Sequence, residues 1–360
     1  MKLVFAVDKI SYNDKDHIGV VKKVEAQMRL FEKSGIKTIL CQYVWEGGYP
    51  QITIEKDTDV LYFRRIEFSV KLILKFRQLK KINPNLRIIM EIPTYPFEEE
   101  EMNHISFKRK LNMWLGEWLL KYYIDRIVLL AQEPPIEMLY GIPVICAHNG
   151  IEFDRIKERT CRQELGTADE IHLLCVSGCF FWHGYDRIIE ALNLYYQDYN
   201  GDEKVFLHVV GEGNCLKEYV ELSEKYGLLD EVVFFYGRKV GKELDNLFDK
   251  CDIALDCFGA HRKGLTLSSS LKTREYAAKG LPIVTSVALD ICNEDTNKYI
   301  LMLPSGEVPL DVKDIINFYH AIYDGIDKQK VACDIRNKFY PYCDWNIVYK
   351  PIVKYIVEEC

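Results

Sequence analysis

The sequence predicts an α/β protein built from two Rossmann-like, doubly wound domains. The chain has 360 residues, more than one ordinary hydrophobic core accommodates and enough for two. Apolar runs of strand length alternate with segments of helical period along most of it, which is the pattern of parallel strands joined by crossover helices. A polar, charged stretch at 149–168 interrupts the pattern once, as a domain connector does.

The elements follow from this alternation. In the first half, strands are expected at 2–7, 37–43, 60–64, 87–92, 126–130 and 144–147, with helices at 19–34, 70–81 and 106–123. In the second half, strands are expected at 171–176, 205–210, 232–236, 253–256 and 282–285, and helices at 185–196, 214–226, 242–251 and 270–279. The domains are therefore placed at 1–160 and 161–340. A last helix within 341–360 follows a loop rich in Tyr and Pro and is expected to pack back on the first domain.

The composition, with 48% hydrophobic and 28% charged residues, is that of a globular protein in water. The net charge of −7 gives no reason to expect a nucleic-acid partner. Twelve cysteines without a CxxC pair indicate free thiols in a reducing compartment. The opening MKLVFAVDKI lacks the features of a signal peptide, and no apolar stretch approaches the roughly 20 residues that span a bilayer. A cytoplasmic protein is expected, with peripheral contact at the inner membrane face left open.

Two glycine-containing turns follow strands of the second half. VFLHVV runs into Gly211-Glu212-Gly213, and VVFFYG ends in Tyr236-Gly237. Glycine after a parallel strand lets the backbone approach a ligand closely, and a helix that starts there offers N–H groups to phosphate. A plain tight turn between strand and helix explains the same residues.

The segment LSSSLKTREYAAKGLPIV at 267–284 combines hydroxyls, a cation and a carboxylate at a helix start. The hydroxyls of Ser268, Ser269 and Ser270, together with free N–H groups, can hold a diphosphate. Lys272 adds positive charge there, and Glu275 can accept hydrogen bonds from ribose hydroxyls. The alternative is a capped helix whose Lys and Glu are solvated.

In their order along the chain, these motifs resemble the C-terminal domain of GT-B glycosyltransferases, in particular the retaining, bacterial polysaccharide-type enzymes of family 4. The resemblance covers 171–285 and rests on His183-Gly184, on the GEG and YG turns, and on Glu275 in EYAAKGLPIV. It implies two Rossmann-like domains that face a cleft, the second binding a nucleoside diphosphate sugar. The implied reaction is hexose transfer from a UDP-sugar to a carbohydrate or lipid-linked glycan acceptor, with retention of the anomeric centre.

The resemblance also implies residue roles. Glu275 takes the position whose Glu binds the donor ribose, and Lys272 is assigned to the diphosphate. Gly178 and His183 stand in the segment where the family has its diphosphate-binding Arg and Lys, and His183 is expected to be a donor-site residue or a satisfied structural group. Leu267 occupies the place of the family's first Glu, so contacts with the transferred sugar must come from elsewhere.

The first domain of such enzymes binds the acceptor. Gly19 lies in a loop-to-helix entry that resembles the family's glycine-containing first loop, although an ordinary helix entry explains it too. EIPTYP resembles bacterial polysaccharide glycosyltransferases, and it supplies Glu91, Thr94 and Tyr95 as acceptor-side candidates at the end of a strand. Glu91 is the carboxylate expected to orient or deprotonate the acceptor hydroxyl. A merely rigid PTYP loop is the alternative.

The helix expected at 106–123 carries Lys108, Arg109 and Lys110 together with Trp114 and Trp118. A basic, aromatic helix can rest on an anionic membrane. A domain helix with one apolar face in the core explains the same spacing and is the preferred interpretation.

No cofactor and no metal ion are expected. The nucleotide sugar is a substrate, and Asp252 and Asp256 are too far apart to form an Asp-x-Asp metal motif. Whether the chain forms a homo-oligomer stays open. Two other functions fit the same motifs: a sugar-nucleotide epimerase or phosphorylase on the same two-domain plan, and a non-catalytic glycan- or partner-binding protein, which is suggested by Leu267.

Overall fold

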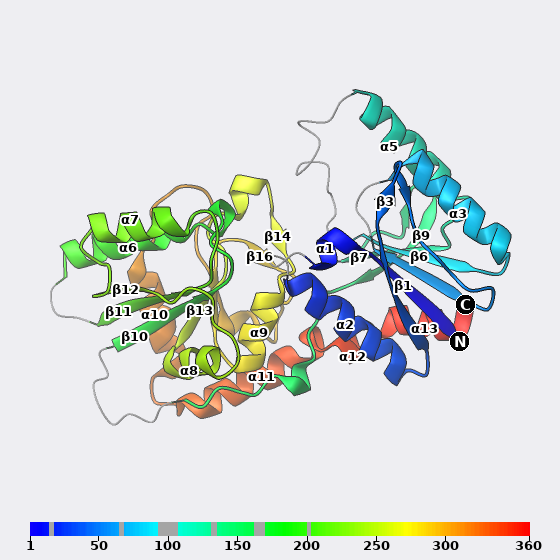
Figure 1. Cartoon of the computed structure of the whole chain (residues 1–360). Helices are drawn as coiled ribbons and strands as arrows, with labels where there is room; N and C mark the ends of the chain where they lie inside the picture. Colours follow the sequence, from blue (N-terminus) through cyan, green and yellow to red (C-terminus); the bar gives the residue numbers. More distant parts are fainter. Residues whose placement is uncertain (14–17, 65–67, 93–106, 131–134, 162–169, 200–202) are drawn as a thin grey trace. The chain divides into compact units, whose positions relative to one another are not determined.

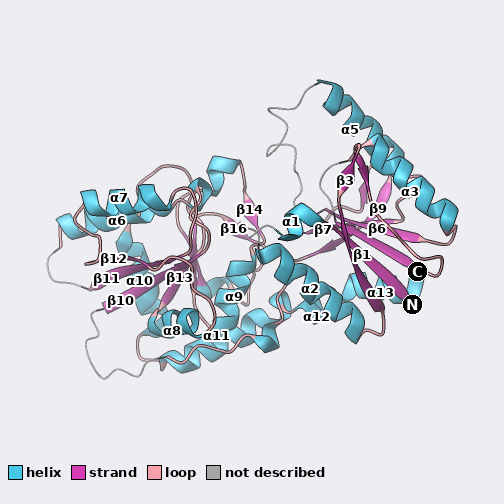
Figure 2. Ribbon diagram, viewed as in Figure 1, coloured by secondary structure: helices cyan, strands magenta, loops and turns pink. Residues whose placement is uncertain are grey.

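The computed structural model describes residues 1–13, 18–64, 68–92, 107–130, 135–161, 170–199 and 203–360. The chain divides into two compact units. Unit 1 comprises Met1–Ile151 and Asp344–Cys360, and unit 2 comprises Glu152–Cys343. In each unit, helices cover both faces of a largely parallel β-sheet (Figure 1 and Figure 2). The predicted α/β class is confirmed.

The sheet of unit 1 has the order β2-β1-β5-β6-β7-β9-β8. Its strands are β1 (Lys2–Asp8), β2 (Lys37–Tyr43), β5 (Val60–Arg64), β6 (Arg87–Ile92), β7 (Arg126–Leu130), β8 (Met138–Leu139) and β9 (Ile142–Ala147). Every neighbouring pair is parallel except β8 and β9, which are antiparallel. The central strands are apolar along nearly their whole length because both faces of the sheet are covered.

Two apolar cores lie on the two faces of this sheet. On one face, α3 (Val70–Ile82) and α5 (Phe107–Leu120) contribute to the core, and Ser69 caps α3 by accepting a hydrogen bond from the Leu72 N–H. On the other face lie α2 (Ile18–Lys33) and the C-terminal helices α12 (Trp345–Val348) and α13 (Lys350–Glu359). The C-terminal segment is thus part of unit 1.

The division between the units lies at Ile151, before the expected end of the first domain at 160. Residues 152–161 belong to unit 2 because Arg159 is buried there. Its guanidinium donates hydrogen bonds to the carbonyl of Cys251 and to the hydroxyl of Tyr323, at 2.8 Å for the latter. A polar stretch of sequence here is therefore packed structure rather than an open connector.

The sheet of unit 2 has the order β12-β11-β10-β13-β15-β17, and all its neighbouring strands are parallel. The strands are β10 (Glu170–Val176), β11 (Lys204–Val210), β12 (Val233–Phe235), β13 (Ile253–Leu255), β15 (Ile283–Thr285) and β17 (Ile300–Met302). Helices α6 (Tyr185–Gln197) and α7 (Leu216–Lys225) cover one face, and α8 (Lys242–Lys250) and α9 (Leu271–Lys279) cover the other (Figure 1). The direction of winding reverses between β10 and β13.

The region between β15 and the C-terminal helices contains elements that the sequence pattern did not predict, among them α10 (Val312–Tyr323) and α11 (Lys328–Cys343). The expected loop rich in Tyr and Pro was wrong, because it forms the end of α11 with Pro341 inside the helix. Proline disfavours a helix interior through its missing N–H. Here a buried apolar face that includes Val331, Ile335 and Phe339 outweighs that cost.

All twelve cysteines lie in the described part of the chain and are free thiols, as expected. Among the helices that the structure describes, none is long and apolar enough to cross a membrane.

Candidate active site

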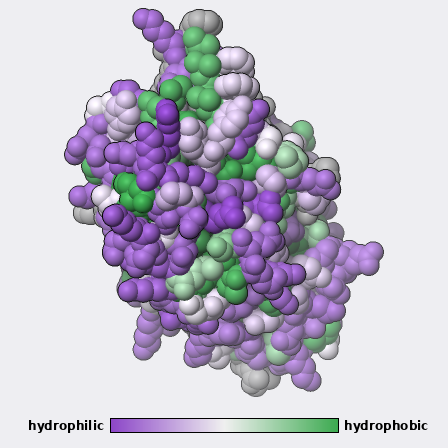
Figure 3. Space-filling view, turned by 90° about the vertical axis from the view of Figure 1, so that its right-hand side faces the viewer, coloured by the Kyte–Doolittle hydropathy of each residue, from purple (hydrophilic) through white to green (hydrophobic). Residues whose placement is uncertain are grey.

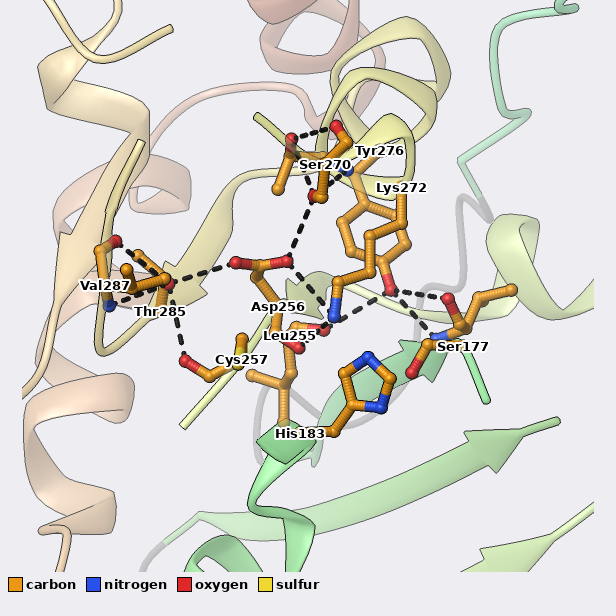
Figure 4. Close-up of polar contacts among 12 residues, drawn as sticks. Ser177, His183, Leu255, Asp256, Cys257, Ser270, Lys272, Tyr276, Thr285 and Val287 are labelled. Atoms are coloured by element: carbon orange, nitrogen blue, oxygen red, sulfur yellow. Dashed lines mark hydrogen bonds and ion pairs between the residues drawn. The ribbon is translucent and has the colours of Figure 1, made fainter. Parts of the chain in front are cut away.

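The carboxyl ends of β10 and β13 flank the point where the strand order of unit 2 reverses. In open α/β sheets, ligands bind at this point. Ser177 follows β10 and Asp256 follows β13 directly, while Ser270 and Lys272 lie at the start of α9 and His183 ends a short 3₁₀ helix (Figure 4). We call these five residues the switch-point site.

A tyrosine that the sequence did not single out holds α9 in this place. The hydroxyl of Tyr276 accepts a hydrogen bond from the Val176 N–H at 2.9 Å and lies 3.3 Å from the Leu255 carbonyl, to which it donates. Tyr276 is fully buried and thus joins the ends of β10 and β13. Because Lys272 lies one turn earlier on the same helix face, this anchor also sets the position of its ammonium group.

Lys272 is paired with a buried carboxylate. Its Nζ donates to the carbonyl oxygen of Asp256 at 2.5 Å and lies 3.2 Å from the carboxylate Oδ1 (Figure 4). The Asp256 side chain is 0% exposed, and its other oxygen accepts from the Thr285 hydroxyl at 3.2 Å. The Lys272 side chain keeps 14% of its surface exposed. An anionic ligand can therefore reach the ammonium group but competes with Asp256 for it.

His183 adds a neutral polar group beside this pair. Its Nδ1 accepts a hydrogen bond from the Phe180 N–H at 3.4 Å, and its ring stacks on Tyr185 with centroids 5.6 Å apart. Burial, together with the nearby positive charge of Lys272, lowers the pKa of His183 to about 2. The ring is uncharged at neutral pH, so it can form hydrogen bonds but cannot supply charge toward a diphosphate.

Three predicted glycines shape the loops around the site. A Cβ on Gly211, where φ is +144°, would stand 1.8 Å from the Ser177 carbonyl oxygen, and one on Gly213 would stand 2.4 Å from the Cys179 carbonyl oxygen. A Cβ on Gly178 would meet the Phe180 ring at 2.4 Å. These glycines allow the loop after β11 to pack on the loop after β10, which is a structural reason for their presence. Contact with a donor stays a prediction.

The YG turn, Tyr236-Gly237, also joins neighbouring parts of the fold. The hydroxyl of Tyr236 is hydrogen-bonded to Nδ1 of the buried His208 at 2.8 Å, and Nε2 of His208 is 2.9 Å from Nδ1 of His172. Gly237 has φ +62° and accepts a hydrogen bond from the Gly211 N–H at 2.9 Å. Tyr236 and Gly237 thus link neighbouring loops and strands, and their donor role is untested.

The three serines lead into α9. Ser268 lies in β14 (Leu267–Ser268), which pairs with β16 (Ala288–Leu289). The Ser269 hydroxyl donates to Asp290 at 2.6 Å, and the Ser270 hydroxyl caps α9 by accepting from the Thr273 N–H. The expectation that these last two hydroxyls are available for a diphosphate needs correction, because they already bond within the protein. A buried ion pair between Arg274 and Asp290, at 2.5 Å, stabilises the same segment.

Glu275 lies half-buried on α9, between Arg274 and Tyr276. Leu267, at the position of the expected Glu, is half-buried in β14. Arg187, which follows His183, is buried, and its guanidinium donates to the backbone carbonyls of Phe258, Pro304 and Val308. Arg187 therefore stabilises loops and does not replace the family's diphosphate-binding cation.

In unit 1 the structure contradicts the expected role of Glu91. The Glu91 carboxylate is 0% exposed and lies 3.1 Å from both Lys23 Nζ and Arg64 Nε. It also accepts hydrogen bonds from the hydroxyl of Tyr62 at 2.8 Å and from the amide of Gln27 at 2.7 Å. Burial by itself would raise the pKa of Glu91, but the charges of Lys23 and Arg64 and these hydrogen bonds lower it to about 2. Such a carboxylate cannot contact an acceptor hydroxyl.

Three further candidates of unit 1 remain: Gly19, predicted to bind the donor, and Thr94 and Tyr95, predicted to bind the acceptor. Gly19 lies in the first turn of α2, as expected. Thr94 and Tyr95 lie outside the described residues. Within the described ranges, no group of three or more His, Cys, Asp or Glu side chains is arranged to hold a metal ion.

Ser177, Asp256 and Tyr276 were not predicted as parts of this region. Asp256 could have been found, because it is the first polar residue after the buried strand IAL and therefore lies at a carboxyl end. Tyr276 gave no such signal, since a tyrosine in a helix is ordinarily a core residue.

The switch-point site lies in a region that matches a known protein family. Residues 157–293 match the family model described as Glycosyl transferases group 1. The matched residues lie within unit 2. The matched range contains all five residues of the switch-point site. A search of curated protein sequences finds no significant match.

Solved structures of glycosyltransferases resemble the whole chain. A glycosyltransferase from Rickettsia africae aligns with a TM-score of 0.61 at 12% identity, covering 100% of this chain and 99% of that one. HepE from Anabaena, solved with UDP and glucose, gives 0.59 at 14% identity over 99% of each chain. The lipopolysaccharide outer core galactosyltransferase WaaB gives 0.58 at 12% identity over 100% of each. The predicted GT-B fold of two Rossmann-like domains is confirmed. At these identities the similarity shows the fold alone.

Proposed function

We propose that this protein transfers a hexose from a UDP-sugar to a carbohydrate or lipid-linked glycan acceptor, with retention, in polysaccharide or glycoconjugate synthesis. The observation that carries the proposal is the ammonium group of Lys272, held at the switch point of a group 1 glycosyltransferase domain. HepE, which has a similar fold, was solved with UDP and glucose, and this motivates a UDP-sugar as the proposed donor. Retention and membership of family 4 rest on the motif around Glu275.

The chemistry needs a site for negative charge. The bond between the anomeric carbon and the diphosphate oxygen breaks, and its electron pair leaves with the nucleoside diphosphate. The acceptor hydroxyl oxygen forms the new bond to the anomeric carbon and loses its proton. Lys272 stabilises the charge that develops on the leaving group, and the first N–H groups of α9 add to this field.

The remaining assignments are parts of the same proposal. Glu275 accepts hydrogen bonds from the donor ribose, and the backbones of Gly178, Gly211 and Gly213 in unit 2 line the path of the nucleotide sugar. Gly19 is assigned to donor binding by the resemblance of its loop alone. His183 contributes a neutral hydrogen bond.

Since Asp-x-Asp is absent around Asp252 and Asp256, we propose a reaction that needs no metal ion and occurs in the cytoplasm.

A donor panel tests the proposal. UDP-, GDP- and TDP-sugars are added in turn, and donor binding is measured by thermal shift and donor turnover by release of nucleoside diphosphate, with and without EDTA. We expect stabilisation by one UDP-sugar and turnover that requires an acceptor glycan. Consumption of the sugar nucleotide without any acceptor would instead indicate an epimerase or a phosphorylase. Absence of binding to all nucleotides and nucleotide sugars would reject every enzymatic function.

The role of Glu275 has its own test. Glu275→Ala is expected to keep the melting temperature and to weaken UDP binding about tenfold, since a charge-assisted hydrogen bond is lost. Glu243→Ala, which removes an exposed carboxylate of α8, is the control and should bind UDP normally. Unchanged UDP affinity in Glu275→Ala would remove this residue from the donor site.

A further inference from the structure

Helix α5 of unit 1 has two apolar faces. One packs into the core through Met113 and Leu120, and Gly116 brings this face so near to α3 that a Cβ there would lie 3.0 Å from the Ser69 backbone. The preferred interpretation from the sequence, a helix whose apolar face lies in the core, accounts for these residues only. It does not account for the opposite face.

The opposite face exposes large apolar side chains in a helical stripe, and the chain adds one more directly after the helix. Trp114 is 60% exposed and Trp118 is 54% exposed. We define the exposed α5 face as Leu111, Trp114, Leu115, Trp118 and Tyr122. Figure 3 shows hydrophobic side chains gathered at the top of the view, at the height where Figure 1 places α5. Large exposed apolar patches of this kind mark binding surfaces.

A hollow adjoins the two tryptophans. It has a volume of about 310 Å³ and is lined by Trp114, Glu117, Trp118, Lys121, Tyr140 and Gly141. The Lys121 ammonium lies 5.4 Å from the centre of the Trp118 ring and 5.3 Å from that of Tyr122. Aromatic rings beside a cation form a surface that suits the boundary between lipid headgroups and acyl chains.

The charge around this face is positive in a chain whose net charge is −7. Residues 107–122 carry four cations and one carboxylate, Glu117, which gives a local charge of +3. Of the cations, Lys108, Lys110 and Lys121 are exposed. Lysines at this position attract anionic lipid phosphates, each contributing about a fivefold gain in binding.

We propose that the exposed α5 face docks the protein on a bilayer that contains anionic lipids. The 14-residue helix is shorter than the roughly 20 residues that span a bilayer, so it lies in the plane of the interface. Leu111 and Leu115 enter the acyl boundary, Trp114 and Trp118 lie at headgroup depth, and the lysines face lipid phosphates. Charge complementarity distinguishes this partner from a neutral protein surface.

The test uses the whole chain and vesicles of two compositions, phosphatidylcholine alone and phosphatidylcholine with phosphatidylglycerol. We expect flotation with the anionic vesicles and a blue shift of tryptophan fluorescence. The double variant Trp114→Ala, Trp118→Ala should bind these vesicles with an affinity lower by roughly tenfold or more. The matched control Val240→Ala, Ile326→Ala removes two exposed apolar side chains of unit 2 and should bind as the unchanged protein does.

Charge variants separate attraction by lysines from general stickiness. Lys108→Gln with Lys110→Gln should weaken binding to anionic vesicles by about fivefold for each lysine. The acidic run at 98–101 precedes the helix in the sequence and lies outside the described residues. Replacement of this run by glutamines should strengthen binding to the anionic vesicles.

Three outcomes would overturn the proposal: no flotation of the unchanged protein, equal binding by the double tryptophan variant, or equal binding to both vesicle compositions. A concentration-dependent dimer that disappears in the double tryptophan variant, without flotation, would assign the face to a second copy of the chain. None of these results depends on UDP-sugar turnover, so the docking proposal and the proposed function can fail independently.

Discussion

Each unit places a fully buried carboxylate at the carboxyl end of a strand, Glu91 in β6 and Asp256 after β13, yet the surroundings of the two differ. Glu91 has two cations, Lys23 and Arg64, as well as hydrogen bonds from Tyr62, Gln27 and Tyr349. Asp256 has one cation, Lys272, whose side chain reaches the surface.

This difference separates structure from function. The Glu91 cluster joins α2, β5, β6 and the C-terminal segment, because Tyr349 donates to the carboxylate at 3.2 Å. Its two cations together hold the carboxylate, with Lys23 5% exposed and Arg64 14% exposed. The Asp256 pair holds a cation that can change partners when an anion arrives. Position at the end of a strand therefore does not make a carboxylate catalytic. The two clusters differ in how many cations hold the carboxylate, two for Glu91 and one for Asp256.

The largest expected effect comes from Glu91→Ala. It removes the buried carboxylate that faces Lys23 and Arg64, and we expect the free energy of unfolding to fall by about 3–5 kcal/mol. Urea unfolding measures this. The control is Glu55→Ala, which breaks the exposed ion pair with Lys2 and should leave the free energy of unfolding nearly unchanged. If Glu91→Ala kept its stability and lost only turnover, the catalytic role would be restored.

Lys272→Ala should have the next largest effect, on catalysis rather than stability. Removal of one group that stabilises a developing oxyanion costs about 10²–10³-fold in turnover. The matched control Lys217→Ala removes an exposed lysine of α7 in the same unit and should be neutral. Nucleoside diphosphate release measures both variants. Normal turnover in Lys272→Ala would contradict the division of roles between the two carboxylate clusters.

Asp256→Asn sharpens the comparison, because it should move stability and binding in opposite directions. The Lys272 ammonium loses its counter-ion, so the free energy of unfolding should fall by about 1–3 kcal/mol. UDP no longer competes with Asp256 for this ammonium, so its Kd should fall about tenfold, or about 1.4 kcal/mol. Calorimetry measures Kd, and weaker UDP binding in the variant would show that Asp256 itself supports the ligand.

The smallest effect is the pH dependence of stability. The pKa of Glu91 is about 2 in the folded protein, against an ordinary value of 4.5. The stabilisation by Glu91 is therefore complete above pH 4.5 and is lost as the pH falls toward 2. Urea midpoints measured from pH 7 to pH 3 should fall less steeply for Glu91→Gln than for the unchanged protein. Parallel curves for the two proteins would mean that Glu91 does not carry this linkage.

Much of the fold could be predicted from the sequence because its signals are local. The apolar strand at 87–92 and the helix at 185–196 agree with β6 and α6 almost to the residue. The end of α11 could not be predicted, since Pro341 is a local signal against a helix and only packing overrides it. The division at Ile151 lies within the polar stretch at 149–168, but residues 152–160 were assigned to the first domain. Arg159 looks like a surface residue until its partners Cys251 and Tyr323 are known.

By itself, the sequence determined the two doubly wound sheets and the segment that contains Lys272 and Glu275, because strand periodicity and a helix start depend on neighbouring residues. Tertiary structure alone decided which polar groups are available. In the folded chain the hydroxyls of Ser269 and Ser270 form internal hydrogen bonds, and Glu91 is buried in unit 1. Folding also places Asp256 next to Lys272. The physical reason is that burial and charge pairing depend on residues far apart in the chain, which no local pattern records.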